Sequence, residues 1–416
     1  MGIEPTVMDP GAGSATPAAM YSASCFAVGA LQCLDEHMLL VSIFMRGGSD
    51  ATRTRVDRRG RPPPPDSRRG VAMNPVLVDA LRGTAVESTH RGAFAVVDAD
   101  GSVVASLGDI ERPVFPRSAV KVLQALPLIA SGAADRLGLT DEELALACAS
   151  HGGEEIHART AAGMLAKSGL DLAALECGTH WPYNEAAARA LAAHGTLPTA
   201  LNNNCSGKHA GFLCLACALH DGPDLQRYVR GYIKPEHPVM REATAALQAA
   251  TGYDLAAAPH GTDGCSIPAY AVPLRHLAHA FARVGTGHGL TVGHADAARR
   301  LRAAVANAPY LVAGDGRFDT RVMTRLGARV FCKVGAEGVY CAALPERGLG
   351  VAIKIDDGNN ARAAEVVMAA LIEAFVALDD AEAVFMRESS DVRLVNWNGI
   401  EVGRLVATAP LRSLAR

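Results

Sequence analysis

Hydrophobic and polar positions alternate in two stretches that lie far apart in the chain. Residues 92–109 (GAFAVVDADGSVVASLGD) alternate on both sides of an Asp-Gly pair, which predicts two strands joined by a tight turn. Residues 328–358 alternate again and predict three strands with turns at AEG and PERG. Both ends of the chain beyond residue 72 are therefore expected to contribute strands to a sheet.

Between these stretches, apolar residues recur at helical spacing. The segment PRSAVKVLQALPLIASG predicts a helix that ends near Gly132. Thr140 and Glu143 form a capping-box pattern for a second helix, which is expected to break at the paired glycines of SHGGEE. Residues 155–260 are rich in Ala and Leu with helical period, and NNARAAEVVMAALIEAFVAL predicts a last helix. The order predicts an α+β fold, in which an antiparallel sheet from both chain ends flanks a helical region.

The first 72 residues differ in composition from the rest. Segment 46–69 holds eight arginines and three aspartates, and RGRPPPPDSRRG favours extended polyproline over a packed core. We interpret residues 1–72 as a disordered extension or the result of a start codon placed too early, with the catalytic region at 73–416. The alternative is a basic arm for nucleic acid, but no aromatic residues are interleaved, so no nucleic-acid partner is expected.

Composition narrows the class of protein further. With 416 residues, 49% of them hydrophobic, the chain can bury a large core, and a net charge of −3 indicates neither nucleic acid nor an anionic membrane as a partner. No apolar run reaches the roughly 18 residues that a membrane span needs, and no basic residue precedes the first apolar segment, so no secretory signal is expected. Several of the ten cysteines lie in apolar runs, which favours a reducing, cytoplasmic location.

Two serines and two lysines are candidate catalytic residues. Ser118 and Lys121 have the S-x-x-K spacing of penicillin-binding proteins and class A β-lactamases, in which a lysine of lowered pKa can activate a serine one helical turn away. Ser150 opens the glycine-containing SHGGEE, where the backbone can approach a ligand. Lys333 lies between apolar neighbours in a predicted strand, where an inward amine would need a partner.

Each of these residues also has a purely structural interpretation. Ser118 and Lys121 could begin a helix and face solvent, SHGGEE could be an ordinary helix end, and Lys333 could point outward from its strand. Arg317 in GDGRFDT and Lys354 in KIDDGNN are weaker candidates that also fit turn chemistry and surface charge.

Cys205 and Lys208 open an apolar helix with C-x-x-K spacing, and Cys265 lies in the loop GTDGCSIP. Two loop cysteines about 60 residues apart can converge on one Zn²⁺, which prefers sulfur, with His209, Lys208 or Asp263 as a third ligand. A lysine ligand must first lose a proton, which a metal can enforce. The alternative is two unrelated buried thiols.

Several short strings occur in an order that resembles the thermolabile, rhizobial-type L-asparaginases of the asparaginase II family. The resemblance runs from about Val76 to the C-terminus and leaves residues 1–72 unmatched. The strings are ESTHRG, PRSAVK, ASHGGE, CGTHWP, NNNCSGKHAG, GTDGCSIP, GRFDT and KVGAEGVY.

The resemblance implies a fold similar to serine β-lactamases and glutaminases, hydrolysis of L-asparagine to L-aspartate and ammonia, and a homodimer. It implies two Ser–Lys tandems, Ser118 with Lys121 and Ser150 with Lys333. It also implies zinc ligands and residues that line the substrate and metal site. The implied zinc ligands are Cys205, Lys208 and Cys265, and the lining residues are Arg117, His151 and Asp263.

These observations give a hypothesis with two rivals. Ser118, activated by Lys121, attacks the side-chain amide, and Ser150 with Lys333 relays a proton to the leaving ammonia, while zinc holds substrate and orients groups. The first rival is a serine acylase of the β-lactamase or penicillin-binding type, although the S-D-N and K-T-G motifs are absent. The second is a zinc-held binding protein without catalytic activity, in which the tandems are structural polar pairs.

Overall fold

Strands from both ends of the chain form one antiparallel sheet. The structure, a computed structural model, describes residues 73–415, so the predicted extension of residues 1–72 lies outside the described residues. The main path of the sheet runs β11-β12-β1-β2-β10-β9-β8, and β3 pairs with β2 off this path. The strands are β1 (Val76–Arg82), β2 (Ala85–Asp98), β3 (Val103–Leu107), β8 (Phe331–Val334), β9 (Val339–Leu344), β10 (Leu349–Ile355), β11 (Asp391–Val395) and β12 (Glu401–Ala407).

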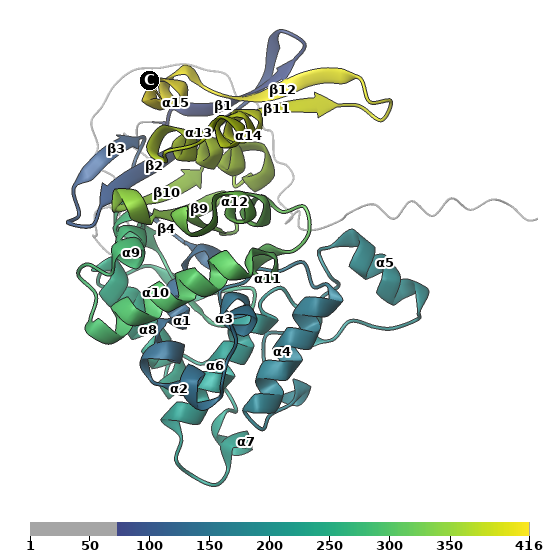
Figure 1. Ribbon diagram of the computed structural model, residues 1–416, viewed down its shortest axis with the longest axis vertical. Coiled ribbons are helices and arrows are strands. Elements are labelled where there is room, and N and C mark those ends of the chain that lie inside the picture. Colours follow the sequence, from purple (N-terminus) through teal and green to yellow (C-terminus); the bar gives the residue numbers. More distant parts are fainter. Residues whose placement is uncertain (1–72, 416) are drawn as a thin grey trace, which may run out of the picture. The chain divides into compact units, whose positions relative to one another are not determined.

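A helical region lies between the two strand groups in sequence and on one side of the sheet in space (Figure 1). It contains α1 (Lys121–Ala130), α2 (Ala133–Arg136), α3 (Asp141–Ala147), α4 (Glu155–Lys167), α5 (Glu185–Ala193), α6 (Ser206–Leu219), α7 (Leu225–Tyr228), α8 (Pro238–Thr251), α9 (Leu274–Thr286), α10 (Val292–Asn307), α11 (Pro309–Ala313) and α12 (Phe318–Leu326). Two short strand pairs accompany these helices: β4 (Pro113–Val114) with β7 (Val272–Pro273), and β5 (His260–Thr262) with β6 (Pro268–Tyr270). The α+β architecture expected from the sequence is confirmed.

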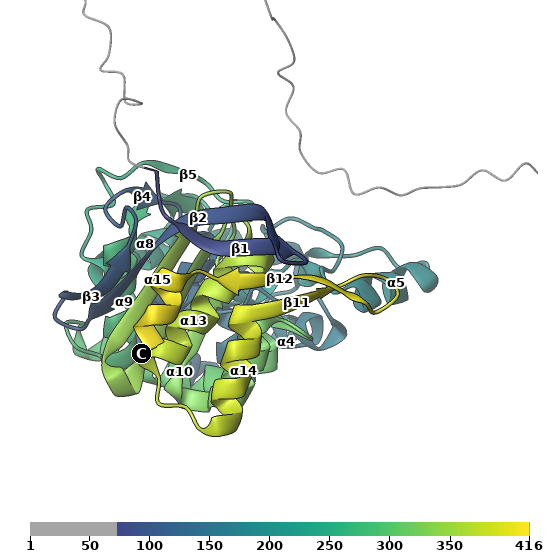
Figure 2. The same cartoon turned by 90° about the horizontal axis from the view of Figure 1, so that it is seen from above.

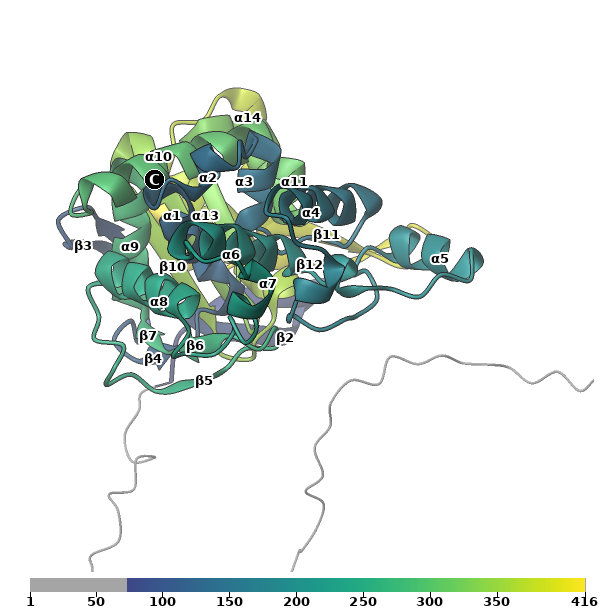
Figure 3. The same ribbon diagram turned by 90° about the horizontal axis from the view of Figure 1, so that it is seen from below.

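The C-terminal helices cover the other side of the sheet. They are α13 (Glu365–Phe375), α14 (Asp380–Ser390) and α15 (Ala409–Arg412). They lie in front of the sheet in Figure 2, whereas Figure 3 shows the helical region in front and α5 projecting to the side. Because helices cover both sides, β9 is buried along its whole length, which explains its uninterrupted VYCAAL sequence. Among residues 73–415, no helix is both long and apolar enough to cross a membrane.

Helix α6 lies inside the helical region and supports the site. Its residues from Ser206 to Cys217 are all buried, as expected for a helix that is apolar on every side. It packs against α1, α3, α4 and α8. The three polar residues of its first turn, Ser206, Lys208 and His209, are all buried and therefore lie inside the protein and not on its surface.

One sequence prediction about an element is wrong, and one pair of strands was not predicted. The capping box of Thr140 and Glu143 forms, but α3 ends at Ala147, before the paired glycines. The chain leaves the helix early because the Ser150 N–H donates to Val312 O at 2.8 Å and the His151 N–H donates to Asn204 O. The hairpin β11–β12 was not predicted, although it joins the C-terminal end of the chain to β1.

Close contact between α9 and β10 depends on one glycine. A Cβ at Gly350 would lie 2.0 Å from Ala278 O and 2.3 Å from Ala282 N, so helix and strand approach backbone to backbone. The substitution Gly350→Ala is expected to lower the free energy of unfolding by at least about 1–3 kcal/mol, because neither backbone can move freely. Chemical denaturation followed by circular dichroism measures this.

A matched control for Gly350 is Gly285, which lies on α9. At Gly285 a Cβ would have its nearest neighbours at 3.5 Å, which is ordinary contact. Gly285→Ala should therefore leave stability unchanged or raise it by about 0.5–1 kcal/mol, as a helical Gly→Ala change does. Equal stability of the Gly350→Ala variant and the wild type would contradict this account of the packing.

Candidate active site

The amine of Lys121 lies at the centre of the site. Lys121 begins α1 and is 1% exposed, and its Nζ donates to Ser150 Oγ at 2.9 Å and to Ala149 O. The Cys205 thiol lies close to the same amine. Burial lowers the pKa of Lys121, although the Cys205 thiol acts against this shift.

The serine partner of Lys121 differs from the pairing implied by sequence. Lys121 is hydrogen-bonded to Ser150, and within residues 73–415 no hydrogen bond joins Ser118 to Lys121 or Ser150 to Lys333. Ser118 lies in the short 3₁₀ helix Arg117–Val120 that precedes α1. The i, i+3 spacing brings Ser118 and Lys121 near each other in sequence, but the amine turns toward the end of α3.

The two serines nevertheless share one cavity. It has a volume of about 170 Å³ and opens to solvent beside the loop that precedes α5. Its lining residues are Ser118, Ser150, Tyr183, Asn204, Arg317, Val334, Gly335, Ala336 and Asn360. Two hydroxyls in a space of this size can act on one small substrate.

Lys333 immediately precedes Val334, Gly335 and Ala336, which line the cavity. Its side chain is fully buried, so the outward-facing interpretation is wrong, and its Nζ donates to Val334 O at 2.8 Å. Burial lowers the pKa of Lys333 to about 7; Asp319 acts against this shift, and Lys121 adds to it. Asp319 is itself held by the Val334 N–H and by the Tyr340 hydroxyl. Lys333 can therefore exchange a proton near neutral pH.

A cluster of two thiols and an amine adjoins Lys121. Lys208 Nζ lies 2.9 Å from Cys265 Sγ, and the Cys265 and Cys205 thiols lie close together. All three side chains are buried. The contact with Cys265 lowers the pKa of Cys205 well below its ordinary value, and Lys121 and Lys208 add to this effect against burial.

The same three side chains fit a zinc ion in kind and in placement. Two sulfurs and one nitrogen converge, and these are donors that Zn²⁺ prefers. Among residues 73–415, no group of three or more His, Cys, Asp or Glu side chains could hold a metal, so a third ligand has to come from Lys208. Burial alone would lower the pKa of Lys208, but the thiols outweigh it and raise that pKa, so a metal would have to displace the proton.

Arg117 and Asp263 form an ion pair beside the thiols. Arg117 Nε donates to Asp263 Oδ1 at 3.0 Å, and Arg117 adopts a φ of +51°, which is rare for a side chain of this size. Burial would raise the pKa of Asp263, but Lys208 and Arg117 reverse this and lower it. Arg117 does not line the cavity of Ser118. It lines a separate pocket of about 440 Å³ together with Phe115 and Lys354.

His151 supports α6 from inside the protein. It is fully buried, its Nε2 lies 3.0 Å from Ser206 Oγ, and its Nδ1 accepts from the Gly153 N–H. Burial lowers the pKa of His151 well below its ordinary value, and His157 adds to the shift, so the ring is neutral. Its contacts place it at the start of α6, next to Cys205.

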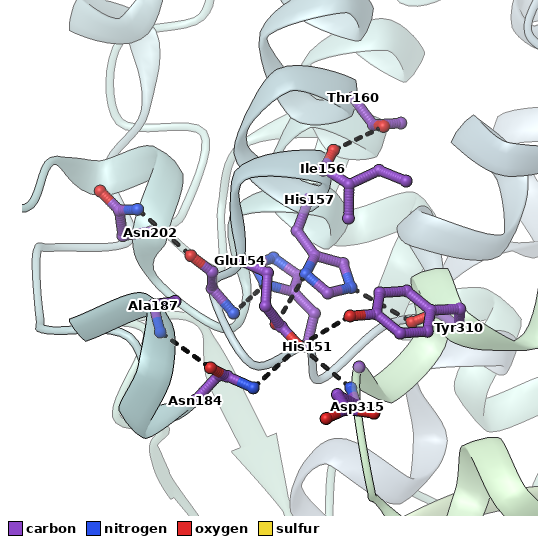
Figure 4. Close-up of polar contacts among 12 residues, drawn as sticks. His151, Glu154, Ile156, His157, Thr160, Asn184, Ala187, Asn202, Tyr310 and Asp315 are labelled. Atoms are coloured by element: carbon purple, nitrogen blue, oxygen red, sulfur yellow. Dashed lines mark hydrogen bonds and ion pairs between the residues drawn. The ribbon is translucent and has the colours of Figure 1, made fainter. Parts of the chain in front are cut away.

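The carboxylate of Glu154 ties together the segments around the cavity (Figure 4). His157 Nδ1 lies 2.9 Å from Glu154 Oε2, and the Asp315 N–H donates to Oε1 at 3.0 Å. The Asn184 amide and the Tyr310 hydroxyl both lie 3.4 Å from Oε1. Burial would raise the pKa of Glu154, but these contacts, led by His157, lower it.

The position of Glu154 requires small neighbours. A Cβ at Gly152 or at Gly314 would lie 2.4 Å from a Glu154 carboxylate oxygen, and Gly314 adopts a φ of +98°. The 150–154 loop and the loop before α12 can therefore both close onto the carboxylate. The sequence contained this residue within ASHGGE, but no spacing rule singled it out, because its partners come from separate segments.

Comparison with known proteins identifies the class and then the family. A family model described as L-asparaginase II matches residues 78–407, so the chain is an amidohydrolase by class. It belongs to the L-asparaginase II family, as the sequence resemblance indicated. No match was found among curated proteins.

Solved structures with related architecture were also found. A putative β-lactamase from Bacteroides dorei has 16% identity and a TM-score of 0.37, covering 65% of this chain and 86% of its own. A β-lactamase from Mycobacterium bovis has 14% identity and a TM-score of 0.31, covering 64% and 88%. Mglu has 16% identity and a TM-score of 0.29, covering 70% and 69%.

The substitution Glu154→Gln tests the carboxylate that joins these segments. The amide keeps the shape but removes the charge, so the contacts with His157 and the Asp315 N–H weaken, and unfolding should become easier by about 1–3 kcal/mol at neutral pH. A lowered pKa stabilises the fold above the unfolded value of about 4.3, and this contribution is lost as pH falls through the folded value. The difference from wild type should therefore shrink in acid, as measured by thermal unfolding at several pH values.

Glu155→Gln is the matched control for this variant. Glu155 is exposed and begins α4, one residue further along the chain. Its substitution should leave stability nearly unchanged. A Glu154→Gln variant as stable as Glu155→Gln at neutral pH would contradict the role given to the carboxylate.

Proposed function

We propose that the protein hydrolyses the side-chain amide of L-asparagine to L-aspartate and ammonia through an acyl-enzyme. The observation that carries this proposal is the cavity that Ser118 and Ser150 share, with the buried Lys121 amine 2.9 Å from Ser150 Oγ. Membership of the L-asparaginase II family supports the same substrate class. A homodimer in the cytoplasm remains a prediction from the resemblance and the cysteine content.

In the first step, Ser118 Oγ attacks the amide carbon to give a tetrahedral oxyanion, and the serine proton passes to the neutral amine of Lys333, whose pKa is about 7. Ser118 lies at the start of the helical segment that continues into α1, where the helix dipole favours negative charge. The backbone N–H groups of Ser118 and Ala336 donate no hydrogen bond within residues 73–415, and both residues line the cavity. They are available to stabilise the oxyanion, an effect worth about 3–4 kcal/mol per donor in other hydrolases.

In the second step, the C–N bond breaks and the leaving nitrogen takes a proton as ammonia. The Ser150 hydroxyl, hydrogen-bonded to Lys121, is the group best arranged to pass that proton. Lys333, with a pKa of about 7, is the group best suited to accept one at neutral pH. Water then attacks the ester on Ser118, and the same groups return the serine hydroxyl as L-aspartate leaves.

Zinc fits a supporting role in this scheme. Cys205, Lys208 and Cys265 would hold it, and the bound ion would supply a positive charge that fixes the start of α6 and orients neighbouring groups. The chain's own serines already provide a nucleophile, so the proposed steps need no metal-activated water.

Ammonia release from L-asparagine and L-glutamine by the purified protein tests the activity. Ser118→Ala and Ser150→Ala should each lower kcat by at least about 100-fold, because each removes a group that takes part in proton transfer or attack. Ser131→Ala, an exposed serine at the end of α1, is the control. Rapid quenching followed by peptide mass spectrometry should locate the acyl group on Ser118.

Three outcomes would contradict the assignment. Near-normal kcat in Ser118→Ala would exclude it as the nucleophile, and an acyl group on Ser150 would exchange the two serine roles. Stable labelling by a β-lactam without ammonia release would favour the acylase rival instead.

The lowered pKa of Lys333 predicts the pH dependence of turnover. A lysine accepts a proton only when neutral, so kcat should rise as pH increases through about 7. Lys333→Arg keeps the charge at every accessible pH and should lose the rise together with most activity. Lys234→Arg, at an exposed lysine, should keep the wild-type profile. A profile that is flat between about pH 6 and 8 would count against Lys333 as the base.

Elemental analysis of the purified protein tests zinc. We expect about one zinc per chain, and a Cys205→Ser, Cys265→Ser double variant should lose it and bind substrate more weakly, since hydroxyls are poor zinc ligands. Cys217→Ser, at a buried cysteine at the other end of α6, is the control. A double variant that keeps both zinc and the wild-type KM would contradict this assignment.

A further inference from the structure

Arg317 brings an unpaired positive charge to the cavity of the two serines. It precedes α12 and lines the cavity, and within residues 73–415 its guanidinium makes no hydrogen bond or ion pair. Its charge contributes to the lowered pKa of Lys333, so the two groups interact electrostatically. An unpaired guanidinium in a cavity is suited to bind a carboxylate through two parallel hydrogen bonds.

Asn360 lines the same cavity and carries an acceptor without a partner. Its Nδ2 donates to Gly335 O at 2.9 Å, which fixes the orientation of the amide. Its Oδ1 is buried and has no hydrogen-bond partner among the described residues. Buried polar atoms are rarely left unpaired, and an acceptor of this kind is suited to an ammonium group.

The protein holds Arg317 in place through the loop before α12. Glu154 accepts from the Asp315 N–H, and Thr320 Oγ1 donates to Gly314 O at 2.7 Å. Both contacts bracket Arg317 and leave its side chain free. The other arginine near the serines, Arg117, is instead paired with Asp263 and lines a different pocket.

We propose that Arg317 binds the α-carboxylate of the substrate and that Asn360 Oδ1 binds its α-ammonium. This inference rests on the proposed function, since it assigns the residues that recognise the amino-acid end of the molecule while Ser118 and Ser150 act on its amide. The cavity thus selects a free α-amino acid amide over a simple amide or a peptide-linked one.

Two analogues separate these contacts in the wild-type protein. Succinamate keeps the carboxylate and the amide but lacks the α-ammonium, and L-asparagine methyl ester keeps the ammonium but has no charged carboxylate. Each should have kcat/KM lower than L-asparagine by about 10- to 100-fold, the size expected for one charge-assisted hydrogen bond. Ammonia release measures side-chain hydrolysis in all three cases.

Variants then assign each loss to a residue. Arg317→Met should lower kcat/KM for L-asparagine and for succinamate by a similar factor but leave kcat/KM for the methyl ester nearly unchanged. Asn360→Ala should lower kcat/KM for L-asparagine and for the methyl ester but leave kcat/KM for succinamate nearly unchanged. Arg321→Met is the matched control, because Arg321 lies in α12, four residues after Arg317, is not among the residues that line the cavity, and has its guanidinium over the Phe318 and Phe385 rings.

The readouts distinguish failure of this inference from failure of the proposed function. If Arg317→Met lowers kcat/KM equally for all three compounds, or not at all, Arg317 does not read the carboxylate. If Asn360→Ala misfolds, the wild-type protein still tests the contact with the α-ammonium. Equal kcat/KM values for succinamate and L-asparagine would overturn the role given to Asn360. Calorimetric binding of L-aspartate needs no turnover. If the wild-type protein binds L-aspartate and Arg317→Met does not, the inference is supported even without turnover. A wild-type protein that released no ammonia would overturn only the proposed function.

Discussion

The buried amine of Lys121 is the interaction on which the rest of the site depends. An ammonium group inside a protein is costly unless polar partners surround it, and here they are Ala149 O, the Ser150 hydroxyl and the Cys205 thiol. These partners come from the end of α3 and the start of α6, so both must lie close to α1. The early end of α3 follows from this requirement, because a helix continued to the glycines would carry Ala149 O and Ser150 away from the amine.

The Lys121 amine consequently affects both the thiol cluster and the groups around the serine cavity. Lys121 lowers the pKa of Cys205, which favours a thiolate in the cluster with Lys208 and Cys265, and it also lowers the pKa of Lys333, which precedes the residues that line the cavity. In surroundings of low dielectric such interactions extend further than in water. The charge of the thiol cluster, whether balanced by a proton or by a metal, therefore reaches the groups that face the two serines, even though the cluster itself does not line the cavity.

The sequence predicted the elements better than it predicted the contacts. The alternation in residues 92–109 and 328–358 identified strands of the sheet, and the capping box at Thr140 identified the start of α3, because these signals are local. The pairing of Ser118 with Lys121 rested on spacing and on the family resemblance, and neither records that the amine turns toward Ser150. Glu154 and Asn360 were missed for the same reason, since their roles depend on partners brought near only by the complete fold.

The two arginines near the serines illustrate why chemistry has to be read from the environment and not from residue type. Arg117 precedes Ser118 in the chain and is the obvious candidate for a substrate anion, but its guanidinium is already neutralised by Asp263. A carboxylate that took the place of Asp263 there would break a partly buried ion pair and leave Asp263 without its partner, which is costly. Arg317 incurs no such cost, because nothing among residues 73–415 has to be displaced from it. The proposal therefore assigns recognition of the substrate carboxylate to Arg317, whose guanidinium has no partner among residues 73–415, while Arg117 pairs with Asp263 beside the thiols.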